Sequence, residues 1–330
     1  MIFIFSLMIS TMISVSSSTW MGMWMGLEIN LLSIIPLMNN KNNIYSSEAS
    51  MKYFITQALA STILMFSIIL MSKNMMSIWT NQHLMIILNS AFLTKMGAAP
   101  FHFWFPEVME GLSWMNCLIL LTWQKLAPMI LLMYNISFSL FLSLIIVLSM
   151  LISGVMGLNQ IKLRSIMAYS SINHIGWMIA SMFLMNSTWM YYFMTYTILS
   201  INLIMMFNIL NIFFIKQLIS FSNNNFLFKL IFIMNFMSMG GLPPFLGFFP
   251  KWLTIQNLIY QSHFMLSVMM TILTLITLYY YMRLMYSTLM FNYNEINFLI
   301  KFKYNNFFLM TNNSIGIIGL IMCTCLFNLL

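Results

Sequence analysis

Long apolar runs separated by short polar segments recur along the whole chain of 330 residues. A helix needs about 20 apolar residues to cross the roughly 30 Å of hydrocarbon in a bilayer. By this measure the sequence predicts 11 membrane-spanning helices, at residues 2–17, 20–38, 53–71, 84–105, 112–134, 136–157, 165–185, 188–214, 229–261, 264–290 and 312–330. The connections leave no room for a soluble domain, so we expect an all-α polytopic membrane protein.

The composition of the chain supports this fold class. Hydrophobic residues make up 61% of the chain and charged residues 5%, against roughly 45–50% and 25% in a soluble domain. So few charges could not cover a soluble globule, which excludes a cytosolic enzyme and a nucleic-acid-binding protein. The 39 Met residues, with few Ala and Val, indicate an AT-rich genome that reads AUA as Met, as in animal mitochondria. Residues 1–18 lack the basic stretch of a cleaved targeting segment, so we expect a retained span.

The basic residues test this topology independently. With 11 spans, the N-terminus and the loops after spans 2, 4, 6, 8 and 10 share one side of the membrane. Those segments carry Lys41, Lys52, Lys162, Arg164, Lys216, Lys229, Lys301 and Lys303. The opposite side carries only Lys73. Because basic loops stay in the compartment of synthesis, we expect the N-terminus in the mitochondrial matrix and the C-terminus in the intermembrane space.

Three other charged positions need no special function. Glu48 and Lys52 stand four residues apart at the start of the third span, where such a pair stabilises a helix. Arg283 lies near the basic-side end of the tenth span, from which its long side chain can reach the interface.

Four charged residues fall near the middle of predicted spans: Glu28, Lys95, Lys125 and Lys251. Each costs about 2.5–3.5 kcal/mol at the centre of an inserted helix, so we expect these residues to be functional. Burial favours the neutral form of a lysine and a nearby carboxylate favours the charged form, so a lysine whose partner moves is a protonation switch. The alternative is a set of static ion pairs, but one glutamate cannot neutralise three lysines. We therefore predict a proton relay.

Histidine adds a further candidate to this set. His174 ends the polar run 169–174 inside an otherwise apolar span, where it is either a relay residue or a hydrogen-bonded packing residue. His102 follows the interruption of the fourth span and is a candidate second stage.

The pattern G-x-x-P-F occurs twice, at residues 97–101 and 241–245. Both copies interrupt a span close to a mid-membrane lysine. Proline removes a backbone donor and breaks the helical ladder, which a bilayer tolerates only where the freed groups are buried or face water. We therefore predict broken helices at about 84–105 and 229–261. The predicted hinge residues are Gly97, Pro100, Gly241, Pro243, Pro244 and Pro250.

The same two copies predict how the chain is organised. Five spans separate them, an odd number, so they cross the membrane in opposite directions. Paired interrupted helices in opposing halves are typical of inverted-repeat transporters, with the ion site at the break. We expect two inverted five-helix repeats, 1–135 and 136–290, followed by a loop and a C-terminal transmembrane helix over 291–330.

Longer motifs surround these candidates. They are residues 24–30 (WMGLEIN), 48–54 (EASMKYF), 100–104 (PFHFW), 122–125 (TWQK), 158–160 (LNQ), 168–171 (AYSS), 174–177 (HIGW) and 240–245 (GGLPPF). Together they resemble mitochondrial NADH dehydrogenase subunit 2, a family of antiporter-like proton-pumping subunits of respiratory complex I. The resemblance covers residues 20 to about 285, and the C-terminal 45 residues match in hydropathy alone.

The resemblance implies a role for each candidate residue. Glu28 corresponds to the channel glutamate of the family, Lys95 to the broken-helix lysine, Lys125 to the central lysine, His174 to the central-axis histidine and Lys251 to the exit-side lysine. It also implies no cofactor or metal on this chain, with NADH, FMN, iron–sulfur clusters and ubiquinone on other subunits. The implied partners are other membrane-arm subunits, including neighbouring antiporter-like subunits, and the lipids of the mitochondrial inner membrane, including cardiolipin, but no nucleic acid.

The main hypothesis is proton translocation coupled to NADH oxidation by ubiquinone elsewhere in complex I. Two alternatives stay open. A free-standing cation/proton antiporter of the same fold would work when purified alone. A purely structural membrane-arm subunit would use its buried charges to hold partners, so neutralising them would disrupt assembly while any complex that formed still pumped protons.

Overall fold

The computed structural model describes residues 2–40, 43–73, 78–136, 140–183, 186–222, 226–243 and 245–290. Over these ranges the chain is α-helical, with one isolated antiparallel bridge between Lys162 and Phe214. The predicted C-terminal transmembrane helix and its preceding loop, together with Lys41 and Pro244, lie outside the described residues. The expected all-helical fold is therefore confirmed for the described residues.

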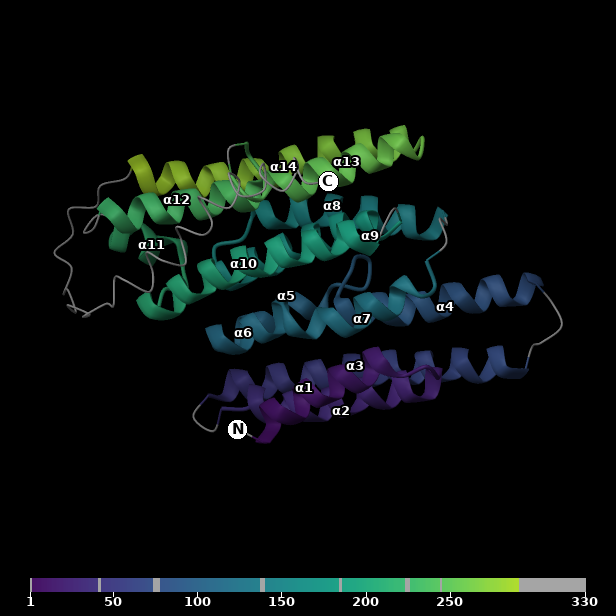
Figure 1. Cartoon of the computed structure of the whole chain (residues 1–330). Helices are drawn as coiled ribbons and strands as arrows, with labels where there is room; N and C mark the ends of the chain where they lie inside the picture. The colour runs from purple at the N-terminus through teal and green to yellow at the C-terminus, as the bar shows by residue number, and fades with distance from the viewer. Residues whose placement is uncertain are drawn as a thin grey trace. The chain divides into compact units, whose positions relative to one another are not determined.

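The chain divides into two compact units, Met1–Ile145 and Ile146–Leu330, whose helices are drawn in Figure 1. The first unit contains α1 (Ile2–Ser16), α2 (Trp20–Met38), α3 (Ile44–Lys73), α4 (Ile78–Met96), α5 (Trp104–Gly111), α6 (Trp114–Leu121), α7 (Trp123–Met133) and the start of α8 (Leu140–Leu158). Within it, α3 packs against α2, α4 and α5, and α7 packs against α1, α4 and α6. Helices α3 and α7 therefore connect most of the other helices of this unit.

The second unit is built around one buried helix. It contains the rest of α8, then α9 (Leu163–Met182), α10 (Asn186–Leu210), α11 (Ile215–Ser222), α12 (Phe226–Gly240), α13 (Phe248–Tyr260) and α14 (Phe264–Met290). Helix α9 packs against α10, α13 and α14, and all of its residues except Arg164 are buried. Because α9 also carries the polar run that ends at His174, the interior of this unit is partly polar.

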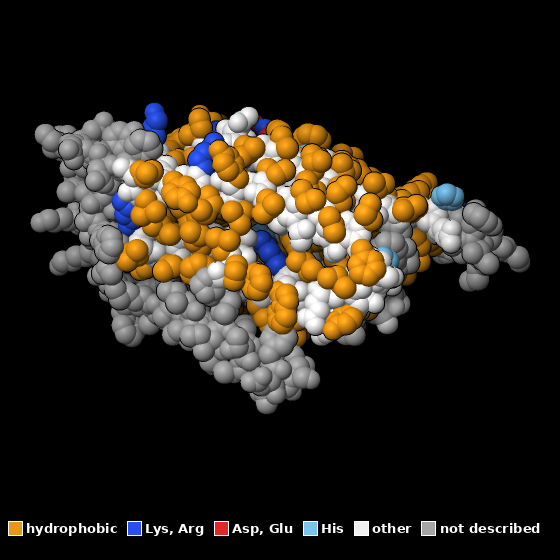
Figure 2. All heavy atoms as spheres, turned by 90° about the horizontal axis from the view of Figure 1, so that it is seen from above, with side chains coloured by type: hydrophobic (Ala, Val, Ile, Leu, Met, Phe, Trp, Pro, Cys, Tyr) orange, Lys and Arg blue, Asp and Glu red, His pale blue; other side chains and the backbone are white. Residues whose placement is uncertain are grey.

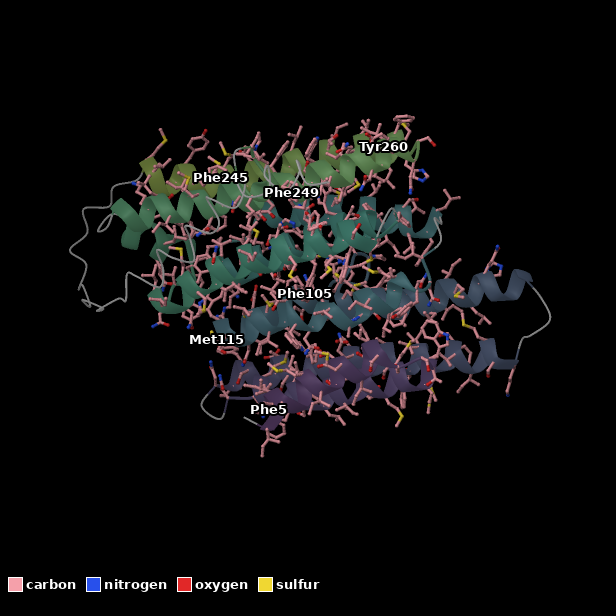
Figure 3. The ribbon with its side chains drawn as sticks, in the orientation of Figure 1. Phe5, Phe105, Met115, Phe245, Phe249 and Tyr260 are labelled. Carbon is pink, nitrogen blue, oxygen red and sulfur yellow. The ribbon has the colours of Figure 1, made fainter. Side chains whose placement is uncertain are left out.

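Six stretches of the described chain are long and apolar enough to cross a membrane: Trp20–Met38, Ile44–Lys73, Trp114–Met133, Leu140–Leu158, Ser187–Leu210 and Phe264–Met290. Hydrophobic side chains cover much of the face in Figure 2, with few lysines and arginines between them. Phe5 of α1 and Tyr260 of α13 point outward from their units (Figure 3). Such surfaces suit a protein surrounded by lipid, so the chain is a membrane protein.

Two helices differ from the prediction. Helix α3 begins at residue 44 instead of 53, and its polar first segment carries Lys52, which pairs with Glu48 at 3.0 Å and with Glu107 at 2.9 Å. The Glu48–Lys52 pair itself is confirmed. The predicted span 112–134 is divided into α6 and α7 at Thr122, whose hydroxyl donates to the carbonyl of Leu118 at 2.8 Å. Such back-bonding bends helices in membranes.

Candidate functional site

Each predicted broken helix contains a real interruption. Helix α4 ends at Met96, and the chain then leaves the helix over residues 97–103 before α5 begins. Helix α12 ends at Gly240, and residues 241–247 separate it from α13. Phe245 lies in this second segment and Phe249 in the first turn of α13 (Figure 3).

A glycine cap ends the helix at both breaks. Gly97 has φ +74° and Gly241 has φ +75°, a left-handed conformation that glycine adopts without strain. The amide after each glycine donates to the carbonyl five residues back, at 3.0 Å in α4 and 3.3 Å in α12. This pattern is the Schellman motif, which satisfies the last carbonyls of a helix. The two breaks therefore share one backbone construction.

The prolines of the motif follow the capping glycines and lie where they also exclude a continued helix. Pro100 comes three residues after Gly97, and Pro243 comes two residues after Gly241. Pro250, which we predicted as a hinge, lies in the first turn of α13, where a helix needs no N–H donor. The hinge role of these residues stays a prediction, to which the structure adds a local cause: glycine caps each helix in the left-handed conformation, and proline keeps the next residues from resuming the helix.

Side chains satisfy further carbonyls at the first break. The Lys95 carbonyl accepts a hydrogen bond from Gln57 Nε2 of α3 at 3.4 Å. The Thr94 carbonyl accepts one from Trp104 Nε1 of α5 at 3.1 Å. Because a buried carbonyl without a partner is costly in a bilayer, these donors from α3 and α5 make the open end of α4 tolerable there.

A lysine occupies the corresponding place at the second break. Lys251 Nζ donates to the Gly240 carbonyl at 2.9 Å and lies 5.9 Å from the centre of the Trp177 ring on α9. A Cβ atom at Gly241 would stand 2.8 Å from this Nζ, so the glycine also makes room for the lysine. The side chain is 7% exposed. Lys251 therefore caps α12 from the helix that follows it.

Lys95 lies in the last turn of α4 and is 8% exposed. The Glu28 carboxylate on α2 is near enough to attract its ammonium group. The C-terminal end of a helix carries partial negative charge, which also favours a cation. Both breaks therefore place a buried lysine at the negative end of a half-helix. Lys95 belongs to the helix whose end it occupies, α4, whereas Lys251 belongs to α13 and reaches back to the end of α12.

Lys125 is the most deeply buried of the three mid-membrane lysines, with 1% exposure. It lies in α7, three residues before Pro128, which cannot donate to the carbonyl four residues back. Its Nζ is 5.3 Å from the ring centre of Phe105, near the start of α5 (Figure 3). The lysine thus lies in a distorted stretch of helix that begins at Thr122.

Buried amides accompany these charges, and the sequence interpretation missed them. Asn30 and Gln124 exchange two hydrogen bonds of 3.0 Å, and the Tyr53 hydroxyl donates to Gln124 Oε1 at 3.4 Å. A signal was present, because each amide stands within two residues of a mid-membrane charge. A neutral amide inside a span is less costly than a charge, so it gives a weaker signal in the sequence.

His174 lies in a cluster of hydroxyl groups within the second unit. Its Nδ1 is 2.9 Å from the Tyr192 hydroxyl, and its ring is 5.2 Å from that of Tyr196. Tyr196 lies near Ser171, and Tyr281 of α14 lies near Ser170. All of these residues are buried. Hydroxyls and imidazole both donate and accept, so this cluster can hold and pass a proton.

The structure brings the predicted residues together in part. The Glu28 carboxylate lies within electrostatic range of Lys95, and His174 lies one helical turn from Trp177, the ring beside Lys251. His102 is buried in the first break, where its Nδ1 is 3.3 Å from the Pro100 carbonyl. The arrangement contains groups that bind and release protons in both units.

Comparison with known proteins identifies the family. The model of the family described as NADH:quinone oxidoreductase/Mrp antiporter, TM, matches residues 17–277. The chain is 48% identical to the NADH-ubiquinone oxidoreductase chain 2 of Anopheles gambiae over 99% of its own length and 97% of that protein.

Solved structures show the same fold at lower identity. A chain of the respiratory complex I from Thermus thermophilus has a TM-score of 0.85 at 21% identity, covering 96% of this chain and 77% of that one. A chain of the Mrp complex from Dietzia has a TM-score of 0.74 at 16% identity, covering 86% and 59%. The resemblance predicted from the motifs is thus confirmed: this chain belongs to the NADH:quinone oxidoreductase/Mrp antiporter family and, within it, to the NADH-ubiquinone oxidoreductase chain 2 proteins.

Proposed function

We propose that this chain is a core membrane-arm subunit of NADH:ubiquinone oxidoreductase that translocates protons across the mitochondrial inner membrane. The observation that carries the proposal is the burial of Lys95, Lys125 and Lys251 to 8%, 1% and 7% exposure, two of them at broken helices. Intramembrane lysines are expensive and are functional as a rule. Membership of the family implies that NADH oxidation by ubiquinone drives proton transfer through these lysines.

Each unit would hold one part of the relay. In the first, movement of Glu28 relative to Lys95 changes how strongly the ammonium form is favoured, so Lys95 binds a proton when the pair is close and releases it when the pair separates. Lys125 is the second site of that unit. In the second unit, His174 and Lys251 bind and release protons in turn. NADH, FMN, iron–sulfur clusters and ubiquinone would belong to other subunits.

The proposed membrane arrangement follows the sequence. It has 11 spans in two inverted five-helix repeats, with the N-terminus in the matrix and the C-terminus in the intermembrane space. The exposed apolar helices would face lipid, including cardiolipin, or other membrane-arm subunits such as neighbouring antiporter-like subunits. The basic residues of the loops support this orientation, because eight of the nine that set it fall on one side.

The test of this function is Lys125→Met in the assembled complex. We expect the variant to oxidise NADH with fewer protons translocated per electron, because methionine fills the space but cannot bind a proton. Lys73→Met is the matched control, since it removes a lysine from the exposed end of α3. If Lys125→Met pumps as well as the control at full turnover, Lys125 does not carry protons.

Similarity to a chain of an Mrp complex keeps a free-standing cation/proton antiporter as the second candidate. Native gel electrophoresis separates the two functions. A complex I subunit migrates in one large assembly with NADH oxidation activity, whereas an antiporter migrates as a small species and transports cations in vesicles on its own. A purely structural subunit is distinguished by Lys125→Met itself, which would then reduce assembly and leave the pumping of the assembled fraction intact.

A further inference from the structure

The amide pair in the first unit links two helices that carry relay residues. Asn30 Nδ2 donates to Gln124 Oε1 and Gln124 Nε2 donates to Asn30 Oδ1, both at 3.0 Å. The two residues are 94 positions apart in the chain and both are buried. Since each amide donates to and accepts from the other, the pair holds α2 and α7 at a defined separation and orientation.

Each amide lies close in sequence to a proposed relay residue but points in a different direction from it. Asn30 is two positions after Glu28 on α2, and Gln124 is one position before Lys125 on α7. Successive residues of a helix are turned by about 100°, so amide and charge point in different directions from the same turn. Lys125 accordingly lies beside Phe105 of α5 while Gln124 faces Asn30.

Helix α3 extends this connection to the first break. Tyr53 donates to Gln124 Oε1 at 3.4 Å, and Gln57, four residues further along α3, donates to the Lys95 carbonyl at 3.4 Å. Residues four apart lie on one face of a helix. One face of α3 therefore contacts both the amide pair and the backbone of the broken-helix lysine.

We propose that Asn30 and Gln124 are positioning residues that hold Glu28, Lys95 and Lys125 at the separations that proton transfer requires. The inference rests on the proposed function. Apolar side chains of similar size would pack α2 against α7 without fixing their direction, whereas two hydrogen bonds in a dry interior fix it closely. Proton transfer needs groups within about 2.6–3.2 Å of each other or of one bridging water, so small shifts of either helix matter.

The decisive experiment exchanges the two amides in the assembled complex. Asn30→Gln and Gln124→Asn each change the length of one side chain, and the double variant restores the combined length. We expect each single variant to lower the rate of proton pumping per complex by about tenfold and to shift its pH profile, since a displacement of about 1 Å can lower a rate by up to roughly 100-fold. The double variant should recover both readouts to within about twofold.

Asn116→Gln is the matched control. Asn116 Nδ2 on α6 donates to the Leu37 carbonyl on α2 at 2.9 Å, so this variant also lengthens an interhelical amide of α2, but far from the relay residues. We expect it to lower the amount of complex and to leave pumping per complex and its pH profile unchanged. The inference is overturned if the single variants behave like this control, or if the double variant pumps no better than the single ones.

Tyr53→Phe keeps the inference testable if the single variants do not assemble. It removes one hydroxyl and retains the ring, and we expect a two- to threefold loss of pumping per complex, in line with about 0.5 kcal/mol for a weak hydrogen bond. Unchanged pumping would count against the inference. Lys125→Met in the same series separates the proposed relay from the proposed positioning role. Normal pumping by Lys125→Met refutes the relay. Loss of pumping by Lys125→Met together with normal pumping by the amide variants refutes only the positioning role.

Discussion

Replacing Gly241 by alanine should disconnect Lys251 from the second break. The new Cβ would stand 2.7 Å from Lys251 Cδ and 2.8 Å from its Nζ, closer than real Cβ contacts. The lysine must therefore move, and it loses its 2.9 Å hydrogen bond to the Gly240 carbonyl. The change adds one methyl group and no charge, so it acts through position alone.

Two penalties add up at this position. A left-handed backbone costs a non-glycine residue about 1–2 kcal/mol, which applies at φ +75°. Loss of the hydrogen bond from Lys251 costs about 1–3 kcal/mol. The total is about 2–5 kcal/mol, of which only the second part concerns the relay. Since about 1.4 kcal/mol is a factor of ten, the anchored arrangement of Lys251 should become roughly 5- to 150-fold less populated.

Gly97→Ala separates the two penalties. Its backbone has φ +74°, so the strain is the same, but the nearest atoms to its Cβ belong to the Phe105 side chain at 3.2 Å. Both variants should therefore lose similar thermal stability from strain, measured as the inactivation midpoint of the purified complex. Only Gly241→Ala should lose its lysine anchor, measured as protons translocated per NADH oxidised in vesicles.

The comparison has a clear refuting outcome. If Gly241→Ala translocates as many protons per NADH as Gly97→Ala and is no less stable, the contact between Lys251 and α12 has no role in pumping. If both variants are inactive to the same extent, strain at the breaks explains the loss, and displacement of the lysine does not.

Three smaller perturbations should give smaller effects. Tyr192→Phe removes the hydroxyl beside His174 Nδ1 and should lower the pumping rate about two- to tenfold, with a changed pH profile; an unaltered profile would show that this contact is not used. Glu107→Gln breaks an exposed pair with Lys52 worth less than about 1 kcal/mol, so pumping should stay normal at every salt concentration. Trp104→Phe removes a donor to the end of α4 and should lower stability by about 0.5–1.5 kcal/mol, seen as a lower inactivation midpoint; an unmoved midpoint would contradict it.

Much of the fold could be predicted from the sequence because lipid imposes a simple requirement. Apolar runs of sufficient length gave helix α2 at residues 20–38 and α14 at 264–290, as the structure has them. Both breaks are predicted from G-x-x-P-F, but the left-handed conformation of the glycine follows only from the structure. Helix α11 was not predicted, because eight residues are too few for a criterion based on the thickness of a bilayer.

The candidate site was predictable only as far as charge reveals it. Glu28, Lys95 and Lys125 were selected because a charge inside a span is rare. The Asn30–Gln124 pair was not, because its partners are 94 residues apart and no local pattern indicates that two amides meet. The hydroxyl beside His174 comes from a different helix, α10, for the same reason. Contacts that depend on tertiary packing leave little trace in one sequence.

The different caps of the two broken helices have a thermodynamic consequence. The buried end of α4 is capped by an amide, Gln57, which has no proton to exchange at physiological pH, so this cap is the same in every protonation state. The end of α12 is held by the amino group of Lys251, which does exchange a proton. If the capped end of α12 binds the charged form of Lys251 more strongly than the neutral form, then by linkage protonation of Lys251 also stabilises the capped helix. The capping group of the second break can therefore couple its own protonation to helix geometry, whereas the side chains that cap the first break, Gln57 and Trp104, exchange no proton.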